Sequence, residues 1–210
     1  LRGSSSAHSS NEVLVDVMRR ALAKTAISPE VLQLIPSDDR STVHALLNAR
    51  GKVDLVIPRG SANLIRTVVD ESSVPTIETG AGVCHVYVDE DADLSKALPI
   101  VLNSKTHRPS VCNAAETLLV HEAVAEKFLP VALAALAESK VKLNVDSKVK
   151  ALADKLNIKS DLASEENWST EYNALEMNVG IVPNLLAASD HIAKYGTKHT
   201  EAIVTENEES

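Results

Sequence analysis

The sequence predicts an α/β fold built around a mostly parallel β-sheet. Short apolar segments of strand length recur along the 210 residues, and most are followed by a longer segment with apolar residues at helical spacing. Such alternation of strands and helices is typical of parallel sheets that are covered by helices. Apolar residues make up 44% of the chain but aromatic residues only 2%, so Ala, Val, Leu and Ile must fill the core.

The first part of the chain alternates amphipathic helices with short strands. A helix is predicted over residues 9–25, because Leu14, Val17, Met18, Ala21 and Leu22 share one face. Polar residues 37–40 are expected to cap a second helix that ends at Leu47, and the spacing of Leu64, Ile65, Val68 and Val69 predicts a third. The predicted strands are 31–35, 53–57, 74–78 and 83–89.

The second part continues the same alternation. A helix is expected from Leu94 to Leu102, with a kink or a late start because Pro99 lacks a backbone donor. Residues 156–173 have no periodicity and are interpreted as a surface excursion or a domain edge. Further helices are predicted over 122–139 and 185–195, and strands over 117–121, 141–145, 177–182 and 201–206.

Charge and hydropathy exclude several classes of protein. The formal net charge is −8, and no basic stripe is present that would bind nucleic-acid phosphates. The longest apolar stretch begins at Phe128, has ten residues and contains a proline, whereas a membrane-spanning helix needs about 20. The N-terminus lacks the apolar core of a secretory signal, so we expect a cytoplasmic protein. Two cysteines are too few for a disulfide framework and should be free thiols.

Few common catalytic or binding motifs occur. The seven histidines show no metal-site spacing, and the GxSxG, GxGxxG and GxxxxGK[ST] motifs are absent, so we expect no metal site. The PRGS turn at Pro58–Ser61 follows a predicted strand and opens a predicted helix, where backbone amides can hold a phosphate. The same residues also suit a tight turn that only changes the direction of the chain.

Cys112 is the candidate nucleophile. A free thiol ionises near pH 8.5, so attack at neutral pH needs a positive group or a backbone dipole that favours the thiolate. Lys105, His107 and Arg108 precede Cys112, and Asn113 follows it, which is an unusually polar setting for a core residue. A buried cysteine that acts as a small hydrophobe is the alternative, and the residues alone leave both open. Cys84, in the alternating segment GVCHVYVD, is interpreted as structural.

Four segments together resemble the gamma-glutamyl phosphate reductase (glutamate-5-semialdehyde dehydrogenase) family of the aldehyde dehydrogenase superfamily. They are VDLVIPRGSANLIR, GVCHVYVDEDADLSKA, RPSVCNAAETLLVH and HIAKYGTKHTEAIVTE. The resemblance implies an aldehyde-dehydrogenase-like fold with a Rossmann-like NADP-binding part, residues 1–106, and an α/β catalytic part, residues 107–210, both incomplete. Residue 1 is Leu, and TENEES breaks off just after a predicted strand, so we expect the middle half of a longer chain.

The resemblance also implies an activity, namely the NADPH-dependent reduction of L-glutamyl 5-phosphate to L-glutamate 5-semialdehyde in proline biosynthesis. Cys112 occupies the position of the family's nucleophile, which forms a thioester, and its main-chain N–H is a candidate oxyanion donor. Glu78 lies near a superfamily glutamate that activates water, but the reductive direction needs no water and gives it no role. The implied cofactor-binding residues are Arg2, Gly3, Ser4, Pro58, Arg59, Gly60, Ser61 and Glu176.

The same resemblance sets the expected partners and the alternatives. The partner is a small-molecule substrate, L-glutamyl 5-phosphate, and the full-length protein is expected to be a homo-oligomer with no nucleic-acid or membrane partner. One alternative is a truncated α/β nucleotide-binding module without turnover. Another is the reductase part of a fused kinase–reductase, a pyrroline-5-carboxylate synthase, although the residues RPS before Val111 are more similar to the stand-alone bacterial type.

Overall fold

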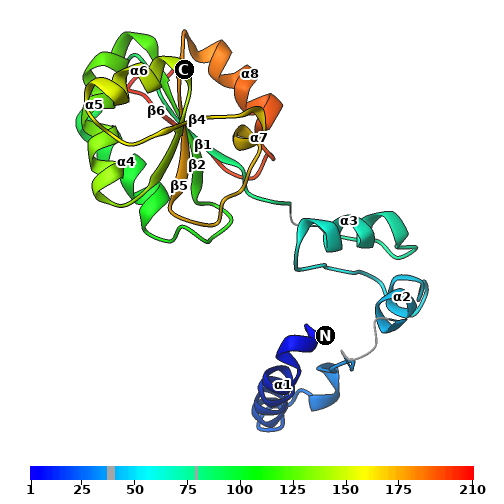
Figure 1. Cartoon of the computed structure of the whole chain (residues 1–210). Coiled ribbons are helices and arrows are strands. Elements are labelled where there is room, and N and C mark those ends of the chain that lie inside the picture. The colour runs from blue at the N-terminus through cyan, green and yellow to red at the C-terminus, as the bar shows by residue number, and fades with distance from the viewer. Residues whose placement is uncertain (37–40, 79) are drawn as a thin grey trace. The chain divides into compact units, whose positions relative to one another are not determined.

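The computed structural model of the chain describes residues 1–36, 41–78 and 80–210. The chain forms two compact units, Leu1–Thr79 and Gly80–Ser210. Figure 1 shows both with their helices and strands labelled, and each unit is described by itself. The boundary expected between a nucleotide-binding and a catalytic part, after residue 106, falls inside the second unit and stays a prediction about function.

The second unit contains a six-stranded sheet in the order β4-β3-β5-β2-β1-β6. All neighbouring strands are parallel. The strands are β1 (Cys84–Val88), β2 (Ala115–His121), β3 (Lys142–Val145), β4 (Asp161–Leu162), β5 (Glu176–Val182) and β6 (Glu201–Val204). The predicted α/β class with a mostly parallel sheet is therefore confirmed.

Helices cover both faces of this sheet (Figure 1). One face carries α4 (Leu94–Thr106), α5 (Glu122–Glu138) and α6 (Ser147–Lys155), and the other carries α7 (Glu165–Trp168) and α8 (Leu185–Tyr195). The strand order explains this division. Successive strands from β1 to β4 are added toward one edge, whereas β6 is added at the opposite edge, and right-handed crossovers in opposite directions place their helices on opposite faces.

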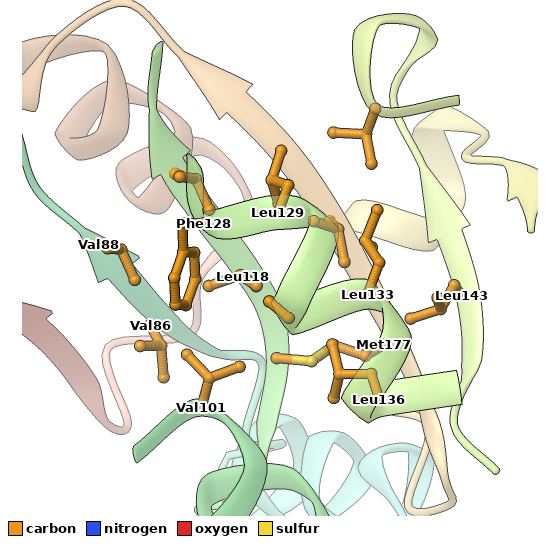
Figure 2. Packing of buried hydrophobic residues seen from close by; sticks show 14 of the residues in the cluster. Val86, Val88, Val101, Leu118, Phe128, Leu129, Leu133, Leu136, Leu143 and Met177 are labelled. Carbon is orange, nitrogen blue, oxygen red and sulfur yellow. The ribbon is translucent and has the colours of Figure 1, made fainter. Parts of the chain in front are cut away.

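The main core lies between the sheet and α4, α5 and α6 (Figure 2). Leu118 and Val120 of β2 point into it, whereas Leu119, between them, packs with Tyr87 on the α8 face. This alternation is the two-residue period of a strand, and both sets are buried because helices cover both faces. Aliphatic side chains dominate the core, as the low aromatic content requires.

Pro99 lies inside α4, which begins at Leu94, so the predicted late start is wrong. The helix start is fixed by Asp93, whose side chain accepts a hydrogen bond from the amide of Ser95 at 2.9 Å. Pro99 cannot bond the carbonyl of Ser95, but both residues are exposed, so water can satisfy that carbonyl. The helix therefore tolerates the proline near its solvent side.

The aperiodic residues 156–173 contain β4 and α7 and are partly inserted into the fold. The hydroxyl of Tyr172 donates to Asn178 Oδ1 of β5 at 2.7 Å and accepts from Asn144 Nδ2 of β3 at 3.0 Å. Asn178 also donates to Thr117 Oγ1 of β2 at 3.1 Å. Tyr172 thus attaches the segment to β5 and β3, and Asn178 extends the network to β2, so the segment is more than a surface excursion.

The first unit contains α1 (His8–Leu22), α2 (Ser41–Leu47) and α3 (Ala62–Glu71), close to the predicted helices. Residues 37–40, predicted to cap α2, lie outside the described part of the chain. The strands predicted over 31–35, 53–57 and 74–78 form only isolated bridges, Arg2 with Ile35, Arg50 with Val53 and Val56 with Thr76. A strand needs a neighbour along its length, and within the described residues these segments pair only through isolated bridges.

The apolar face predicted for the first helix also differs from the structure. Leu14, Val17 and Met18 are exposed on α1, whereas Val15 is buried. On α3 the prediction holds for Ile65 and Val68, which are buried, but Leu64 and Val69 are exposed. No helix of the described residues has the length and apolar character needed to cross a membrane.

Candidate active site

Cys112 lies on the loop between α4 and β2, at the edge of the sheet formed by the amino ends of the strands. The loop turns twice, since the amide of Val111 donates to the carbonyl of Arg108 and the amide of Ala114 to the carbonyl of Val111. Cys112 is exposed, whereas Ala114 and Ala115 are buried where β2 begins. The structure therefore excludes the buried-filler interpretation of Cys112 for this chain.

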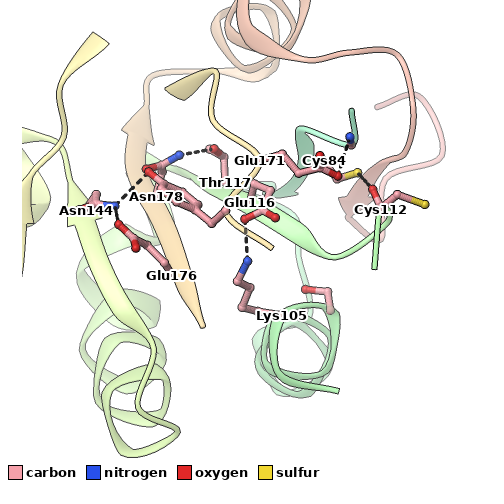
Figure 3. Close-up of polar contacts among 12 residues, drawn as sticks. Cys84, Lys105, Cys112, Glu116, Thr117, Asn144, Glu171, Glu176 and Asn178 are labelled. Atoms are coloured by element: carbon pink, nitrogen blue, oxygen red, sulfur yellow. Dashed lines mark hydrogen bonds and ion pairs between the residues drawn. The ribbon is translucent and has the colours of Figure 1, made fainter. Parts of the chain in front are cut away.

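The backbone of Cys112 is held from one side by the segment that enters β1. Its carbonyl oxygen accepts a hydrogen bond from the thiol of Cys84 at 3.3 Å (Figure 3). Gly82 packs so closely that a Cβ there would lie 1.6 Å from the same oxygen. The thiol of Cys112 points away from these contacts, as Figure 3 shows. The loop thus combines a fixed main chain with an accessible sulfur.

Cys84 has the opposite character. It is buried, and burial, followed by the charge of Glu201, raises the pKa of its thiol to about 11. A thiol with so high a pKa is protonated near neutral pH and acts as a hydrogen-bond donor. The structural role predicted for Cys84 is confirmed, and the role is to hold the Cys112 carbonyl.

Lys105 and Glu116 form an ion pair beneath the Cys112 loop. Lys105 Nζ lies 2.6 Å from Glu116 Oε2, and both side chains are completely buried. Burial raises the pKa of Glu116 to about 7, in spite of the opposing effect of Lys105. Lys105 was expected to favour the Cys112 thiolate, but its ammonium group is paired with Glu116. His107 and Arg108, the other two cations named for this role, are exposed on the loop.

A pocket of about 330 Å³ opens beside the loop. Its lining combines the end of α4 with the loop itself, and includes His107, Arg108 and Asn113. These side chains bring a guanidinium, an imidazole and an amide next to the residue that carries the exposed thiol. The lining also contains the apolar side chains of Val111 and Ala114, so the pocket offers both polar and apolar contacts to a small molecule.

Glu176 begins β5, at the same edge of the sheet. Its Oε1 accepts hydrogen bonds from Lys142 Nζ and Asn144 Nδ2, both at 2.9 Å. Burial would raise the pKa of Glu176, but these two bonds outweigh it and hold the pKa below the usual value. The carboxylate is thus ionised and already paired within the sheet.

Glu171 is a residue of this edge that the sequence did not single out. Its Oε1 accepts a hydrogen bond from the amide of Gly82 at 2.9 Å, on the glycine that packs against Cys112. The two partners are separated by 89 residues. Glu171 lies in an aperiodic segment, so no local pattern could have connected it with Cys112.

The remaining predicted cofactor residues all lie in the first unit. Arg2 forms a bridge with Ile35, a Cβ at Gly3 would lie 1.9 Å from Asn11 Nδ2, and Ser4 caps a short 3-10 helix (Ser5–Ala7). In the PRGS turn, Ser61 caps α3 by accepting a bond from the amide of Leu64 at 3.4 Å. Gly60 has a φ of 157°, which a side chain would disfavour. The turn therefore opens a helix, as predicted.

Among the residues that the structure describes, no three His, Cys, Asp or Glu side chains form a group that could hold a metal ion. The chemistry available at this edge of the sheet consequently centres on the thiol of Cys112. Around it lie the pocket side chains His107, Arg108 and Asn113, the fixed carbonyl of Cys112 and the buried Lys105–Glu116 ion pair.

Comparison with known proteins places these features in context. Residues 4–163 match the aldehyde dehydrogenase family. A gamma-glutamyl phosphate reductase from Thermobifida fusca is 53% identical over 208 residues, 99% of this chain and 49% of that protein. Another from Moorella thermoacetica is 49% identical over 207 residues, again 99% of this chain and 49% of that protein. This chain thus spans about half the length of these relatives.

Solved structures agree with the sequence matches. The crystal structure of gamma-glutamyl phosphate reductase from Thermotoga maritima has a TM-score of 0.90 at 43% identity and covers 100% of this chain and 50% of that chain. A glyceraldehyde-3-phosphate dehydrogenase from Methanocaldococcus jannaschii, at 18% identity, has a TM-score of 0.71 over 99% of this chain and 53% of that chain, which shows a common fold. The aldehyde-dehydrogenase-like fold expected from the sequence is confirmed. The chain belongs to the aldehyde dehydrogenase family.

Proposed function

We propose that this chain is the part of a gamma-glutamyl phosphate reductase that carries the nucleophile. The whole protein then reduces L-glutamyl 5-phosphate to L-glutamate 5-semialdehyde and phosphate. This proposal is supported by relatives of 46–53% identity that are named gamma-glutamyl phosphate reductase. One observation carries the proposal. Cys112 presents an exposed sulfur on a main chain fixed by Cys84 and Gly82, in the segment that resembles the family's nucleophile motif.

In the first chemical step the thiolate of Cys112 attacks the carbonyl carbon of the acyl phosphate. The C–S bond forms as the C–O bond to phosphate breaks, and inorganic phosphate leaves with the electron pair of that bond. A thiolate suits this step, because it is a strong nucleophile and the resulting thioester is reactive. The main-chain N–H of Cys112 is a candidate donor to the oxygen that becomes negative during the attack.

The cofactor that we propose is NADPH. When bound, NADPH supplies the hydride that reduces the thioester to the level of the aldehyde. The chain's own contribution would be the PRGS turn, where the first amides of α3 and the guanidinium of Arg59 suit a phosphate group. Arg2 would favour the additional 2′-phosphate of NADPH, and Gly3 and Ser4 would lie along the ribose.

After reduction, breaking the bond between Cys112 and the substrate carbon releases the product. The C–S bond breaks as the carbonyl of the semialdehyde forms, and the sulfur leaves with the bonding electrons as the thiolate. Glu176 resembles the carboxylate that contacts the nicotinamide ribose in the superfamily. Its Oε1 is bonded to Lys142 and Asn144, so Oε2 would be the oxygen that contacts the ribose.

The proposed setting follows from the activity. We expect a cytoplasmic enzyme of proline biosynthesis that assembles as a homo-oligomer when full length. A module that binds nucleotide without turnover is the competing interpretation, because this chain spans about half of its relatives.

The test is an NADP-linked assay of the protein expressed from its full coding sequence, run from the semialdehyde with phosphate because the acyl phosphate is labile. Cys112→Ser should lower turnover by about three orders of magnitude or more, since serine is a poor nucleophile here. The same variant should keep its affinity for NADPH, measured by nicotinamide fluorescence, which separates lost chemistry from lost folding. Turnover that survives the substitution contradicts the proposal, and NADPH binding by a wild type without turnover supports the module.

A further inference from the structure

The two ends of the Cys112 loop are joined by the Lys105–Glu116 ion pair. Lys105 lies in the last turn of α4, just before the loop, and Glu116 is the second residue of β2, just after it. Their side chains meet at 2.6 Å (Figure 3). The pair therefore joins the two ends of a short chain segment, residues 105–116, that includes the exposed Cys112.

Stability is a weak explanation for this pair. Taking two charges out of water costs several kcal/mol for each ion, and apolar replacements of a buried pair are often neutral or stabilising. Glu116 Oε1 is buried and bonds no other side chain, and the nearby main chain of Tyr172 and Asn173 favours the ionised form. Burial nevertheless raises the pKa of Glu116 to about 7, which shows how poorly the site solvates a charge. Aliphatic side chains would fill this place at lower cost.

Geometry is a better explanation. A charge-assisted hydrogen bond fixes both distance and direction, whereas an apolar contact is non-directional. The other contacts of the loop, from Cys84 and Gly82, act on the carbonyl of Cys112 in its middle. The ion pair joins the two ends of the loop, and the contacts from Cys84 and Gly82 hold its middle at the Cys112 carbonyl. The main chain of the loop is therefore fixed at both ends and in the middle.

We infer that Lys105 and Glu116 are positioning residues for the nucleophile, and that their ion pair orients the Cys112 loop for attack on the acyl group. This inference rests on the proposed function. Neither residue touches substrate in this role; both act through the main chain of the loop. Misplacement of a reacting atom by about 1 Å can cost about 100-fold in rate, so loss of the pair should appear in turnover.

The experiment replaces the pair in the full-length protein by Lys105→Met together with Glu116→Met, which removes both charges and keeps the packing. Glu116→Gln, of nearly equal shape, is the second variant and decides the outcome if the double variant does not fold. Lys150→Met with Asp154→Asn is the matched control, because that pair also meets at 2.6 Å but is partly exposed on α6. For each protein we would measure kcat, the KM for NADPH, thermal unfolding and amide hydrogen exchange in residues 107–115.

A positioning role predicts that the double variant unfolds at or above the wild-type temperature while kcat falls about 10-fold or more. The KM for NADPH should stay within about twofold, since none of the proposed cofactor-binding residues is replaced, and loop amides should exchange about 10-fold faster. The control pair should change none of these. A folded double variant with wild-type kcat and wild-type loop exchange overturns the inference, because the pair is then merely structural.

The two proposals fail in different ways. If the wild-type protein has no turnover, the proposed function fails, and hydrogen exchange of the loop still decides whether the pair orders Cys112. The wild type can instead be active while the double variant has the same loop exchange and the same kcat as the wild type. The positioning role then fails, and the proposed function stands.

Discussion

The α-carbon of Gly82 lies against the carbonyl oxygen of Cys112, so closely that a Cβ at this position would be 1.6 Å from that oxygen. The amide of the same glycine is bonded to Glu171 at 2.9 Å. Only a residue without a side chain allows the strand entering β1 and the Cys112 loop to meet in this way. A single position on one segment therefore sets where the nucleophile loop of another segment lies.

Gly82→Ala should displace the Cys112 loop. The added methyl group meets main-chain atoms that have no freedom to rotate away, so we expect about 1–3 kcal/mol lower stability and at least about 10-fold lower turnover. Urea unfolding and the NADP-linked assay would measure the two effects. Gly80→Ala is the matched control, since a Cβ there meets nothing within 4 Å. Equal behaviour of the two variants would contradict the close approach.

Alkylation should distinguish the two cysteines. Iodoacetamide should modify exposed Cys112 in the folded protein within minutes, whereas buried Cys84, whose pKa is raised to about 11, should remain unmodified until urea is added. Peptide mass spectrometry after a timed reaction would assign each modification. Cys112→Ser should leave the folded protein without a reactive thiol. Modification of both cysteines at equal rates in the native state would be incompatible with their different burial.

His191 should make the protein less stable in acid. Its ring packs against Trp168, Tyr195 and His85, and burial, followed by the charge of His85, lowers its pKa to about 4. The unfolded chain has a pKa near 6.5, so it binds the proton first. The stability that neutral His191 contributes is therefore present above about pH 6.5 and is lost as the pH falls toward about 4.

His191→Phe keeps a ring in this cluster but removes the titration. Between pH 7 and pH 4.5 the variant should lose less free energy of unfolding than the wild type, by about 1–2 kcal/mol. Urea unfolding at the two pH values measures the difference. Exposed His107→Gln serves as the control and should follow the wild type. Parallel pH curves for wild type and His191→Phe would show that burial of this imidazole does not affect its titration.

Asp146 connects two elements and should be costly to remove. Its Oδ1 caps α6 by accepting from the amide of Val149 at 2.7 Å, and its Oδ2 accepts from the amide of Ile181 on β5, also at 2.7 Å. Asp146→Ala should lower the free energy of unfolding by about 2–4 kcal/mol, because it removes a cap and leaves a strand amide unbonded. Asp93→Ala, which removes the cap of α4, should cost less, because no strand amide loses its partner. Equal costs would argue against the bond to β5.

Periodicity predicted most helices and strands of the second unit, because helices on both faces bury those strands, but it did not predict α6, α7 or β4. β1, β2 and β5 carry near-continuous apolar runs, and the alternation within them divides the residues between two cores. The predicted strands of the first unit have the same composition but form only isolated bridges. The composition of a segment indicates that it can form a β-strand. Whether it does so depends on a second strand, elsewhere in the chain, that lies beside it.

The sequence was enough to single out Cys112 as the candidate nucleophile, because a cysteine among Arg, Asn and Ser departs from the composition of a core. The residues that surround Cys112 in the fold could not be predicted in the same way. Lys105 appeared to be a cation for the thiolate, yet the fold pairs it with Glu116, and Glu171 reaches Gly82 across 89 residues. Local patterns record which side chains favour a helix, a strand or an exposed loop. The charges and amides that meet around Cys112 come from separate elements, and only the packing of those elements against each other brings them within bonding distance.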